Sequence, residues 1–465
     1  LTFSTHQNRP HASGVETVQW QDKYQDKLIT AQQAAKFVKN GDRVVFSLMA
    51  QPKTLGLALA ERKDELKGVT LMANGWTEDY PWFQAGWEDS FQVLTAFITR
   101  QTREAMQQKR IDWMPAAFGL HDGVRYEAPM RDAVFHGADV FWCKVTPPDE
   151  GGWCSFGNQV WYSPNALRTA KLAIVEIDET LPFTYGDNVH VSEIDYLVES
   201  PPLELGRVTD TVPLPSPDDF EKSQVIGAHV SSLINDGDTL EIGTGTPTES
   251  VLSFVGDKND LGIHSELIYT QVIDLIKEGV ITGKHKNLNR GKHLASSLFL
   301  YATDPRNAET LRFVDRNPAF EFRDISHICN VPRITSMNNM IAINAIMATD
   351  LLGQANITHL GATPISGPGG QVDFTVGAHY SRGGKSISCL LSTAKNGTAS
   401  RIVPRHSEGA VLLVPCEYID YLVTEHGMVN LNGKTARQRA EAIISIADPQ
   451  FQPWLKEEAK KMFWP

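Results

Sequence analysis

The sequence has few cysteines, no long apolar run and no excess of positive charge. Its five cysteines are scattered, without a Cys-x-x-Cys pair or a zinc-ligand spacing, so we expect neither a disulfide framework nor a metal site. No stretch of about 18 apolar residues is present, and no membrane helix is predicted. The opening segment lacks the basic and apolar regions of a signal peptide. These absences together predict a cytoplasmic protein.

The charge and composition narrow the class of ligand. The net charge of −12 is spread along the 465 residues and argues against nucleic acid or an anionic membrane as the main partner. Hydrophobic residues make up 42% and charged residues 21% of the chain, as in folded globular proteins. A local basic pocket for a small anionic molecule is compatible with this composition.

Two stretches of the chain, 34–72 and 227–267, resemble each other. In both, a helical pattern ends at a Gly-Asp turn and is followed by a β-rich run, a proline-containing loop, a second helix and a short strand. Matching positions are separated by 194 to 196 residues. This order predicts βαβ units, and hence an α/β protein with two similar domains and parallel-rich sheets.

A proline-rich stretch, "ESPPLELGRVTDTVPLPSPDDF", separates the two copies. Its prolines cannot sustain a helix or a central strand. We therefore place one domain in residues 1–210 and the second in residues 211–465.

Glu266 ends a short apolar run in the second copy, "DLGIHSELIYT". Aligning Gly68 with Gly262 places Met72 of the first copy opposite Glu266. In parallel sheets, ligands bind outside the carboxyl ends of the strands. Glu266 fits either a reactive carboxylate at such a site or a solvated side chain just past a strand.

Two glycine-rich loops favour a site. In "EIGTGTPTES", Gly243, Thr244 and Gly245 follow a strand and open a helix, where backbone N–H groups bind anions. With Glu266 after the next strand, this loop is also compatible with a Rossmann dehydrogenase. The second loop, residues 367–370 (Gly-Pro-Gly-Gly), exposes bare backbone and fits either an oxyanion site or a plain turn.

Several longer motifs resemble one known family. They are "GIHSE", "INAIMATDLLGQAN", "GPGGQVDF", "SRIVP" and "YLVTEHGMVNLNGKTARQRA" in the second half, and "DVFWCKVTPPDEGGWCSFG" and "TYGDNVHVSEIDYLVE" in the first. They closely resemble the acetyl-CoA hydrolase and 4-hydroxybutyrate CoA-transferase family of family I coenzyme A transferases. The resemblance runs from about Trp20 to the C-terminus.

This resemblance implies a fold and a role for coenzyme A as a substrate. We expect a pair of CoA-transferase-type (NagB/RpiA-like) α/β domains with the active site between them. Coenzyme A would be a substrate, not a tightly bound cofactor, and the protein would be a homo-oligomer without metal.

The resemblance also implies roles for individual residues. Glu266 matches the catalytic nucleophile, and Gly370 matches the glycine whose N–H holds the thioester oxygen. Asn330 matches an active-site asparagine. Gly367, Gly369 and Gln371 belong to the motif that contains Gly370, and with Gly243, Thr244 and Gly245 they are expected to contact the substrates. The threonines of "GTGTPT" depart from the family's loop, which bears on substrate preference.

A glutamate suits the expected chemistry. Moving CoA between two carboxylates is difficult in one step, and a covalent glutamyl intermediate divides it into easier ones. No proton has to move, so no His dyad is needed, and we interpret His264 as structural or polarising. Negative charge develops on carbonyl oxygens, and one preorganised N–H donor is worth roughly 3 kcal/mol.

The sequence alone identifies neither the acceptor acid nor the residues that bind the phosphates of CoA. Lys395, Arg401 and Arg405 fit phosphate ligands or solvated surface charges equally, and an aromatic set fits either an acid pocket or core packing: Trp76, Tyr80, Trp82, Phe83 and Trp87. The sequence predicts transfer of CoA from acetyl-CoA or succinyl-CoA to a short acid such as 4-hydroxybutyrate, butyrate, itaconate or acetate. An acyl-CoA hydrolase and a non-catalytic acyl-CoA-binding protein are the alternatives.

Overall fold

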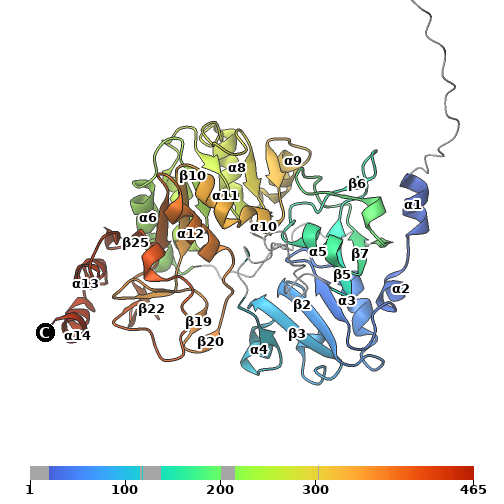
Figure 1. Ribbon diagram of the computed structural model, residues 1–465, viewed down its shortest axis with the longest axis horizontal. Helices are drawn as coiled ribbons and strands as arrows, with labels where there is room; N and C mark the ends of the chain where they lie inside the picture. Colours follow the sequence, from blue (N-terminus) through green and yellow to red (C-terminus); the bar gives the residue numbers. More distant parts are fainter. Residues whose placement is uncertain (1–19, 116–117, 119–137, 200–214, 302, 465) are drawn as a thin grey trace, which may run out of the picture.

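The chain forms two halves, each around its own sheet (Figure 1). The computed structural model describes residues 20–115, 118, 138–199, 215–301 and 303–464. The N-terminal half, blue to green, and the C-terminal half, yellow-green to red, lie side by side along the long axis of the molecule. The predicted α/β class is confirmed. The boundary near residue 210 lies outside the described residues and stays a prediction.

The first half contains a seven-stranded sheet in which all neighbours are parallel. Its strands carry continuous apolar runs, as expected where helices cover both faces of a parallel sheet. In spatial order they are β4 (Asp112–Trp113), β3 (Phe91–Phe97), β2 (Val69–Gly75), β1 (Arg43–Phe46), β5 (Val140–Val145), β7 (Leu172–Ile177) and β9 (Tyr196–Glu199). The helices of this half are α1 (Trp20–Asp26), α2 (Ala31–Ala35), α3 (Lys53–Ala60), α4 (Arg103–Gln107) and α5 (Ser163–Thr169).

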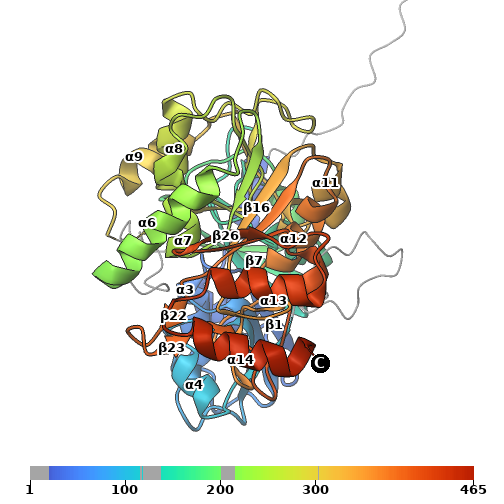
Figure 2. The same ribbon diagram turned by 90° about the vertical axis from the view of Figure 1, so that its left-hand side faces the viewer.

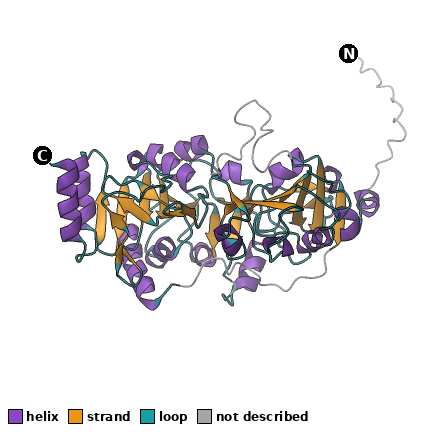
Figure 3. Ribbon diagram, turned by 90° about the horizontal axis from the view of Figure 1, so that it is seen from below, coloured by secondary structure: helices purple, strands orange, loops and turns teal. Residues whose placement is uncertain are grey.

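The second half contains a six-stranded sheet. It is parallel except for its last pair. In spatial order its strands are β11 (Gly262–Ile263), β10 (Thr239–Ile242), β16 (Met340–Ala345), β21 (Lys385–Cys389), β25 (Tyr421–Thr424) and β26 (Gly427–Asn430). Helices lie on both sides of the strands (Figure 3).

The helices of the second half differ in role. Helix α12 follows the Gly-Pro-Gly-Gly loop, and α13 and α14 form a pair at the end of the molecule far from the first half (Figures 1 and 2). In chain order the helices are α6 (Pro217–Ser231), α7 (Thr246–Glu249), α8 (Thr270–Lys277), α9 (Asn307–Val314), α10 (Ile325–Ile328), α11 (Val331–Ser336), α12 (Gln371–Tyr380), α13 (Ala436–Ser445) and α14 (Gln452–Phe463). Among the described helices, none combines the length and apolar character that crossing a membrane requires.

Short strand pairs complete the fold, and several lie near the seam between the halves. They are β6 (Trp153–Cys154) with β8 (Val189–His190), β12 (Leu267–Tyr269) with β14 (Ser297–Phe299), β13 (His293–Ala295) with β15 (Phe320–Phe322), β17 (Ala348–Asp350) with β18 (Ala355–Asn356) and β24 (Ile402–Val403), β19 (His359–Leu360) with β20 (Thr363–Pro364), and β22 (Thr393–Ala394) with β23 (Ala399–Ser400).

The repeated Gly-Asp turns precede equivalent strands, β1 and β10, but the register corrects the sequence alignment. The N–H of Gly41 donates to the carbonyl of Lys67, and the N–H of Gly237 donates to that of Asn259. Thr70 pairs with Arg43, whereas Gly262 pairs with Thr239.

The alignment of Gly68 with Gly262 was therefore wrong by two residues. By register Gly68 matches Asp260, and both have a left-handed backbone with φ values of 64° and 55°. His264 takes the position of Met72, and Glu266 takes that of the buried Asn74.

The two halves share a hydrophobic core. One cluster contains Val45 and Phe141 from the first half together with Ile242 and Leu267 from the second. Backbone bridges also cross the seam, joining Gln159 to Ser297 and Gly186 to Phe322. The strand ends of the two halves are thus held against each other.

Gly186 allows the closest of these backbone approaches. Its φ is +133°, and a Cβ there would overlap with the backbone of Phe322. We expect Gly186→Ala to lower the free energy of unfolding by at least about 2 kcal/mol more than Gly86→Ala. Gly86 also has a positive φ, +85°, but nothing lies within 4 Å of its Cβ position. Urea unfolding followed by tryptophan fluorescence measures both variants, and equal losses would contradict the close approach.

Candidate active site

Glu266 lies where the carboxyl ends of three neighbouring strands of the second sheet meet. It follows β11, while Gly243 follows β10 and Ile346 follows β16. All three residues line one cavity of about 410 Å³. This is the position at which open parallel sheets bind ligands.

The backbone around Glu266 is fixed on both sides. Its carbonyl accepts hydrogen bonds from the N–H groups of Ser296 and Ser297, both at 3.0 Å. The hydroxyl of Ser265 accepts one from the N–H of Ile242 at 3.2 Å. The ring of His264 is fully buried, and its Nε2 lies 2.9 Å from the carbonyl oxygen of Ile328. His264 thus holds two segments together, as its structural interpretation requires.

The carboxyl group of Glu266 meets the start of α12. The N–H of Gly370 donates to its Oε1 at 2.6 Å. Burial raises the pKa of the Glu266 carboxyl to about 8, while the Gly370 N–H opposes this shift and the Asp373 carboxylate adds to it. The positive end of the helix dipole also favours the ionised form. The result is a carboxylate more basic than usual, held in a fixed place.

The cavity in front of Glu266 lies between the two halves. The first half contributes residues that follow the ends of its strands, and the second half contributes both glycine loops. The lining is mainly apolar: Leu48, Met49, Phe97, Ile98, Phe118, Trp161, Leu267, Phe299, Ile346, Met347, Ile357 and Ile365. Such a space with few polar groups is typical of a small-molecule site.

The Gly-Thr-Gly loop offers fewer free donors than its sequence suggests. The N–H of Gly243 donates to the carbonyl of Ile343 at 2.8 Å, and the N–H of Gly245 donates to the carboxylate of Glu249 at 3.0 Å. Gly243 and Thr244 line the cavity, whereas Gly245 does not. Among the described residues, no acceptor is found for the N–H of Thr244. Thr244 is therefore the donor that this loop can present to a ligand.

A buried, hydrogen-bonded pair of side chains, Glu241 and Asn344, supports this loop. Glu241 on β10 accepts hydrogen bonds from the side chain of Asn344 at 2.8 Å and from the N–H of Ile343 at 3.2 Å. Burial and the nearby Glu266 raise the pKa of Glu241 well above its usual value. Glu241 does not line the cavity. Glu241 is fully buried, whereas the half-buried Glu266 faces the cavity.

The second glycine loop, residues 367–370, lines the cavity along its whole length. The N–H of Phe118 donates to the carbonyl of Gly369 at 3.0 Å, which ties the loop to the first half. Gln371 also lines the cavity, and its buried Nε2 has no hydrogen-bond partner among the described residues. The loop and Gln371 thus line the same cavity as Glu266, and their contact with substrates stays a prediction.

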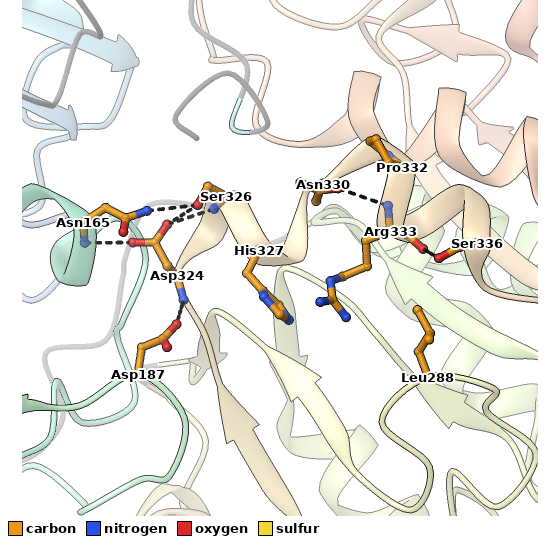
Figure 4. Close-up of a pocket in the computed structure, with 10 residues that line it drawn as sticks. All are labelled: Asn165, Asp187, Leu288, Asp324, Ser326, His327, Asn330, Pro332, Arg333 and Ser336. Atoms are coloured by element: carbon orange, nitrogen blue, oxygen red, sulfur yellow. Dashed lines mark hydrogen bonds between the residues drawn. The ribbon is translucent and has the colours of Figure 1, made fainter. Parts of the chain in front are cut away.

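Asn330 lies in a different cavity, of about 580 Å³ (Figure 4). Its side chain caps α11 by accepting a hydrogen bond from the N–H of Arg333 at 3.0 Å. Figure 4 shows Arg333 and His327 pointing into the same space, with Asp324 on the other side. The preceding residue, Cys329, is buried beside Glu266. A direct role for Asn330 in catalysis stays a prediction.

The basic residues predicted to bind the phosphates of CoA do not line the cavity in front of Glu266. Arg401 donates to the carbonyls of Thr393 and Met347, at 3.0 and 3.2 Å, and lies behind the cavity wall. Lys395 and Arg405 are exposed, and neither lines the cavity. For all three residues, phosphate binding stays a prediction.

The aromatic set of the first half packs in the core. Trp76, Tyr80, Trp82 and Phe83 are buried in one cluster, and Trp87 packs against it. None of them lines the cavity. The core alternative is the one that the structure bears out.

The sequence offered no sign of several lining residues. Phe97, Phe299 and Arg103 come from segments without a motif, and the folding of the two halves against each other places them at the site. Arg103 lies in the segment "ITRQTREAM". A basic residue shortly after the apolar run "FQVLTAFI" was the one available signal.

Burial disfavours the reactive thiolate form of two cysteines, Cys154 and Cys329. Burial raises the pKa of the Cys154 thiol to about 12 and that of Cys329 well above its usual value. Within the described part of the chain, no group of three or more His, Cys, Asp or Glu side chains is placed to hold a metal ion.

Comparison with known proteins agrees with this geometry. Residues 13–205 match the family described as "Acetyl-CoA hydrolase/transferase N-terminal domain", and residues 307–459 match its C-terminal domain. The chain is 38% identical over 457 residues to the 4-hydroxybutyrate coenzyme A transferase of Clostridium kluyveri, covering 96% of this chain and 100% of that protein. The chain belongs to the acetyl-CoA hydrolase/transferase family. Its relatives include CoA-transferases, which supports an enzyme that transfers CoA and rules out a Rossmann dehydrogenase.

Solved structures of similar proteins share the fold. RipA from Yersinia pestis superposes with a TM-score of 0.84 and 29% identity, covering 96% of this chain and 99% of that one. The 4-hydroxybutyrate CoA-transferase from Porphyromonas gingivalis gives a TM-score of 0.76 and 31% identity, with 96% and 100% coverage. The expected pair of CoA-transferase-type domains is confirmed.

Gly370 tests the contact at the centre of the site. A Cβ at this position would overlap with Oε1 of Glu266 and Sγ of Cys329. We expect Gly370→Ala to displace the carboxylate and to lower kcat/KM for CoA transfer by at least about 100-fold. Steady-state kinetics with an acyl-CoA donor and a short acid measures this loss.

Gly369→Ala is the matched control. Its φ of +55° costs backbone strain, but its Cβ would lie 3.6 Å from Oε2 of Glu266, an ordinary contact. We expect a clearly smaller loss than for Gly370→Ala. Similar losses in both variants would show that loop strain, and not the Glu266 contact, determines the rate.

Proposed function

We propose that this protein moves CoA from an acyl-CoA donor, acetyl-CoA or succinyl-CoA, to a short carboxylic acid through a covalent glutamyl-CoA thioester at Glu266. The observation that carries this proposal is the Glu266 carboxylate, which lines the cavity and is bound by the Gly370 N–H. Its raised pKa, about 8, makes the ionised form a better nucleophile than an ordinary glutamate.

The first half of the reaction loads the enzyme. An oxygen of Glu266 attacks the thioester carbonyl of the donor, the C–S bond breaks, and CoA leaves as a thiolate. The product is a mixed anhydride between the acyl group and Glu266. The thiolate then attacks the glutamyl carbonyl and releases the donor acid as its carboxylate. Glu266 is left as a CoA thioester, and no proton has moved.

The second half of the reaction reverses these steps with a new acid. The acceptor carboxylate attacks the glutamyl carbonyl, forming a second anhydride and freeing the thiolate. The thiolate attacks the acyl carbonyl of the acceptor. This gives the new acyl-CoA and returns Glu266 to its carboxylate. Covalent catalysis thus replaces one termolecular encounter by a series of bimolecular ones.

Each attack places negative charge on a carbonyl oxygen next to Glu266. The donors available near that position are the N–H groups of Gly370 and Thr244 and the Nε2 of Gln371. All three come from the starts of helices or the loops before them, so little reorganisation is needed when the charge develops. These donors support the roles predicted for the two glycine loops.

The apolar lining of the cavity supports transfer over hydrolysis. An anhydride is lost if water reaches it, and the aromatic side chains of Phe97, Phe118, Trp161 and Phe299 surround the space. The acid to test first is 4-hydroxybutyrate, because the chain is similar to the 4-hydroxybutyrate coenzyme A transferase of Clostridium kluyveri. Butyrate, itaconate and acetate, which the family resemblance also suggests, come next. A cytoplasmic location and a homo-oligomeric state stay predictions.

Replacing the nucleophile tests the mechanism. Glu266→Gln keeps an oxygen for the Gly370 N–H but cannot form the anhydride, so we expect transfer from acetyl-CoA to a panel of these acids to fall by at least about 10⁴-fold. Glu241→Gln is the control, since Glu241 is a buried carboxyl that does not line the cavity. We expect it to keep most of its activity.

Three outcomes of this assay discriminate the alternatives. Thioester loss that needs no acceptor acid would indicate a hydrolase. Transfer by Glu266→Gln at the parent rate would refute the nucleophile. Binding of acetyl-CoA without transfer or hydrolysis in the parent would indicate a non-catalytic binding protein.

The pH dependence follows from the raised pKa. Only the ionised carboxylate attacks, and a pKa of about 8 leaves about a tenth of Glu266 ionised at pH 7. We therefore expect kcat/KM for the acyl-CoA to rise about tenfold per pH unit up to roughly pH 8 and then to level off. Initial rates with acetate as acceptor between pH 5.5 and 9.5 measure this profile. A flat profile over that range would contradict the raised pKa.

A further inference from the structure

The cavity in front of Glu266 contains a cation that the mechanism above does not use. Among the described residues that line it, two are charged: Glu266 and Arg103. Arg103 is the first residue of α4, which begins shortly after β3 ends. Because Arg103 is exposed while it lines the cavity, it lies at the opening, whereas Glu266 is half-buried.

The guanidinium of Arg103 has no partner within the described part of the chain, neither a hydrogen bond nor an ion pair. Other cations of the same region do have partners. Arg100 lies 3.6 Å from a carboxylate oxygen of Asp79, and Lys53 lies 3.1 Å from one of Glu78. In a chain with a net charge of −12, an unpaired arginine at the mouth of a cavity is available to an anion.

The basic residues of the second half are less suited to this role. Arg401 is held by two backbone carbonyls, and burial lowers its pKa. Lys395 lies in the turn between β22 and β23 and does not line the cavity. Arg103 is thus the basic side chain that a ligand entering the cavity would meet.

We propose that Arg103 binds a phosphate group of CoA at the mouth of the cavity. This inference rests on the proposed function, because it takes CoA as the ligand. The thioester must reach Glu266 past the apolar lining, so the pantetheine arm occupies the cavity. The phosphates, which are strongly hydrated, then lie at the opening where Arg103 is. An arginine binds phosphate in a bidentate manner with charge-assisted hydrogen bonds.

A carboxylate of the acceptor acid is the other anion that Arg103 could bind. The reacting carboxylate of the acceptor must lie at Glu266, so only a dicarboxylate has a second one to offer. The wall between Glu266 and the opening is mainly apolar, and a short diacid would leave its second charge against that wall. The position of Arg103 at the opening therefore favours phosphate.

Binding measurements test this proposal without catalysis. Titration calorimetry compares CoA, 3′-dephospho-CoA and pantetheine on the parent, Arg103→Ala, Arg103→Gln and Arg100→Ala. We expect both Arg103 variants to bind CoA on the order of tenfold more weakly, the loss of a charge-assisted pair. Binding of pantetheine, which has no phosphate, should not change. Arg100→Ala removes the same charge three residues away and should bind CoA like the parent.

Two results would overturn the assignment, and a third would separate it from the proposed function. Equal losses for CoA and pantetheine would mean that Arg103 shapes the cavity and does not bind phosphate. Unchanged CoA binding, with transfer to succinate reduced relative to butyrate, would assign Arg103 to the acceptor. If the parent binds CoA through Arg103 but transfers none, the proposed function fails while the phosphate site stands.

Discussion

The hydrogen bond from the Gly370 N–H to the Glu266 carboxylate is the contact on which the rest of the site depends. It joins the end of β11 to the start of α12, and both glycine loops and the seam between the halves are arranged around it. Burial without this donor would raise the pKa of Glu266 further, and the carboxylate would not be ionised in the range where the enzyme has to work. A solvent-exposed Glu266 carboxylate, by contrast, would be an ordinary and weakly nucleophilic glutamate.

The two halves supply different parts of this arrangement. The second half holds the carboxylate, the N–H donors and the buried Glu241–Asn344 pair that supports the Gly-Thr-Gly loop. The first half supplies apolar walls such as Phe97 and, at the opening, Arg103. A shared core and backbone bridges across the seam fix one half against the other. The site is thus a product of the interface, and neither repeat contains it alone.

The sequence predicted the fold but not the walls of the cavity. Residue types and spacing left Glu266 between a reactive carboxylate and a solvated side chain, and the family resemblance assigned roles to Glu266, Gly370 and the two loops. The structure brings these residues to one cavity. The strand register was missed because the left-handed turn before it is formed by Gly68 in one repeat and by Asp260 in the other, so a glycine-based alignment slipped by two residues. Arg103 and Phe299 reach the site only through tertiary packing, which no local pattern encodes.

The covalent intermediate is the central claim, and trapping it is the most direct test. The protein is incubated with succinyl-CoA in the absence of an acceptor acid, treated with borohydride, digested and examined by mass spectrometry. The account predicts that Glu266, and no other carboxyl group, is reduced to the alcohol, and only when acyl-CoA was present. An unmodified Glu266 under these conditions, or a modification at another residue, would contradict the mechanism.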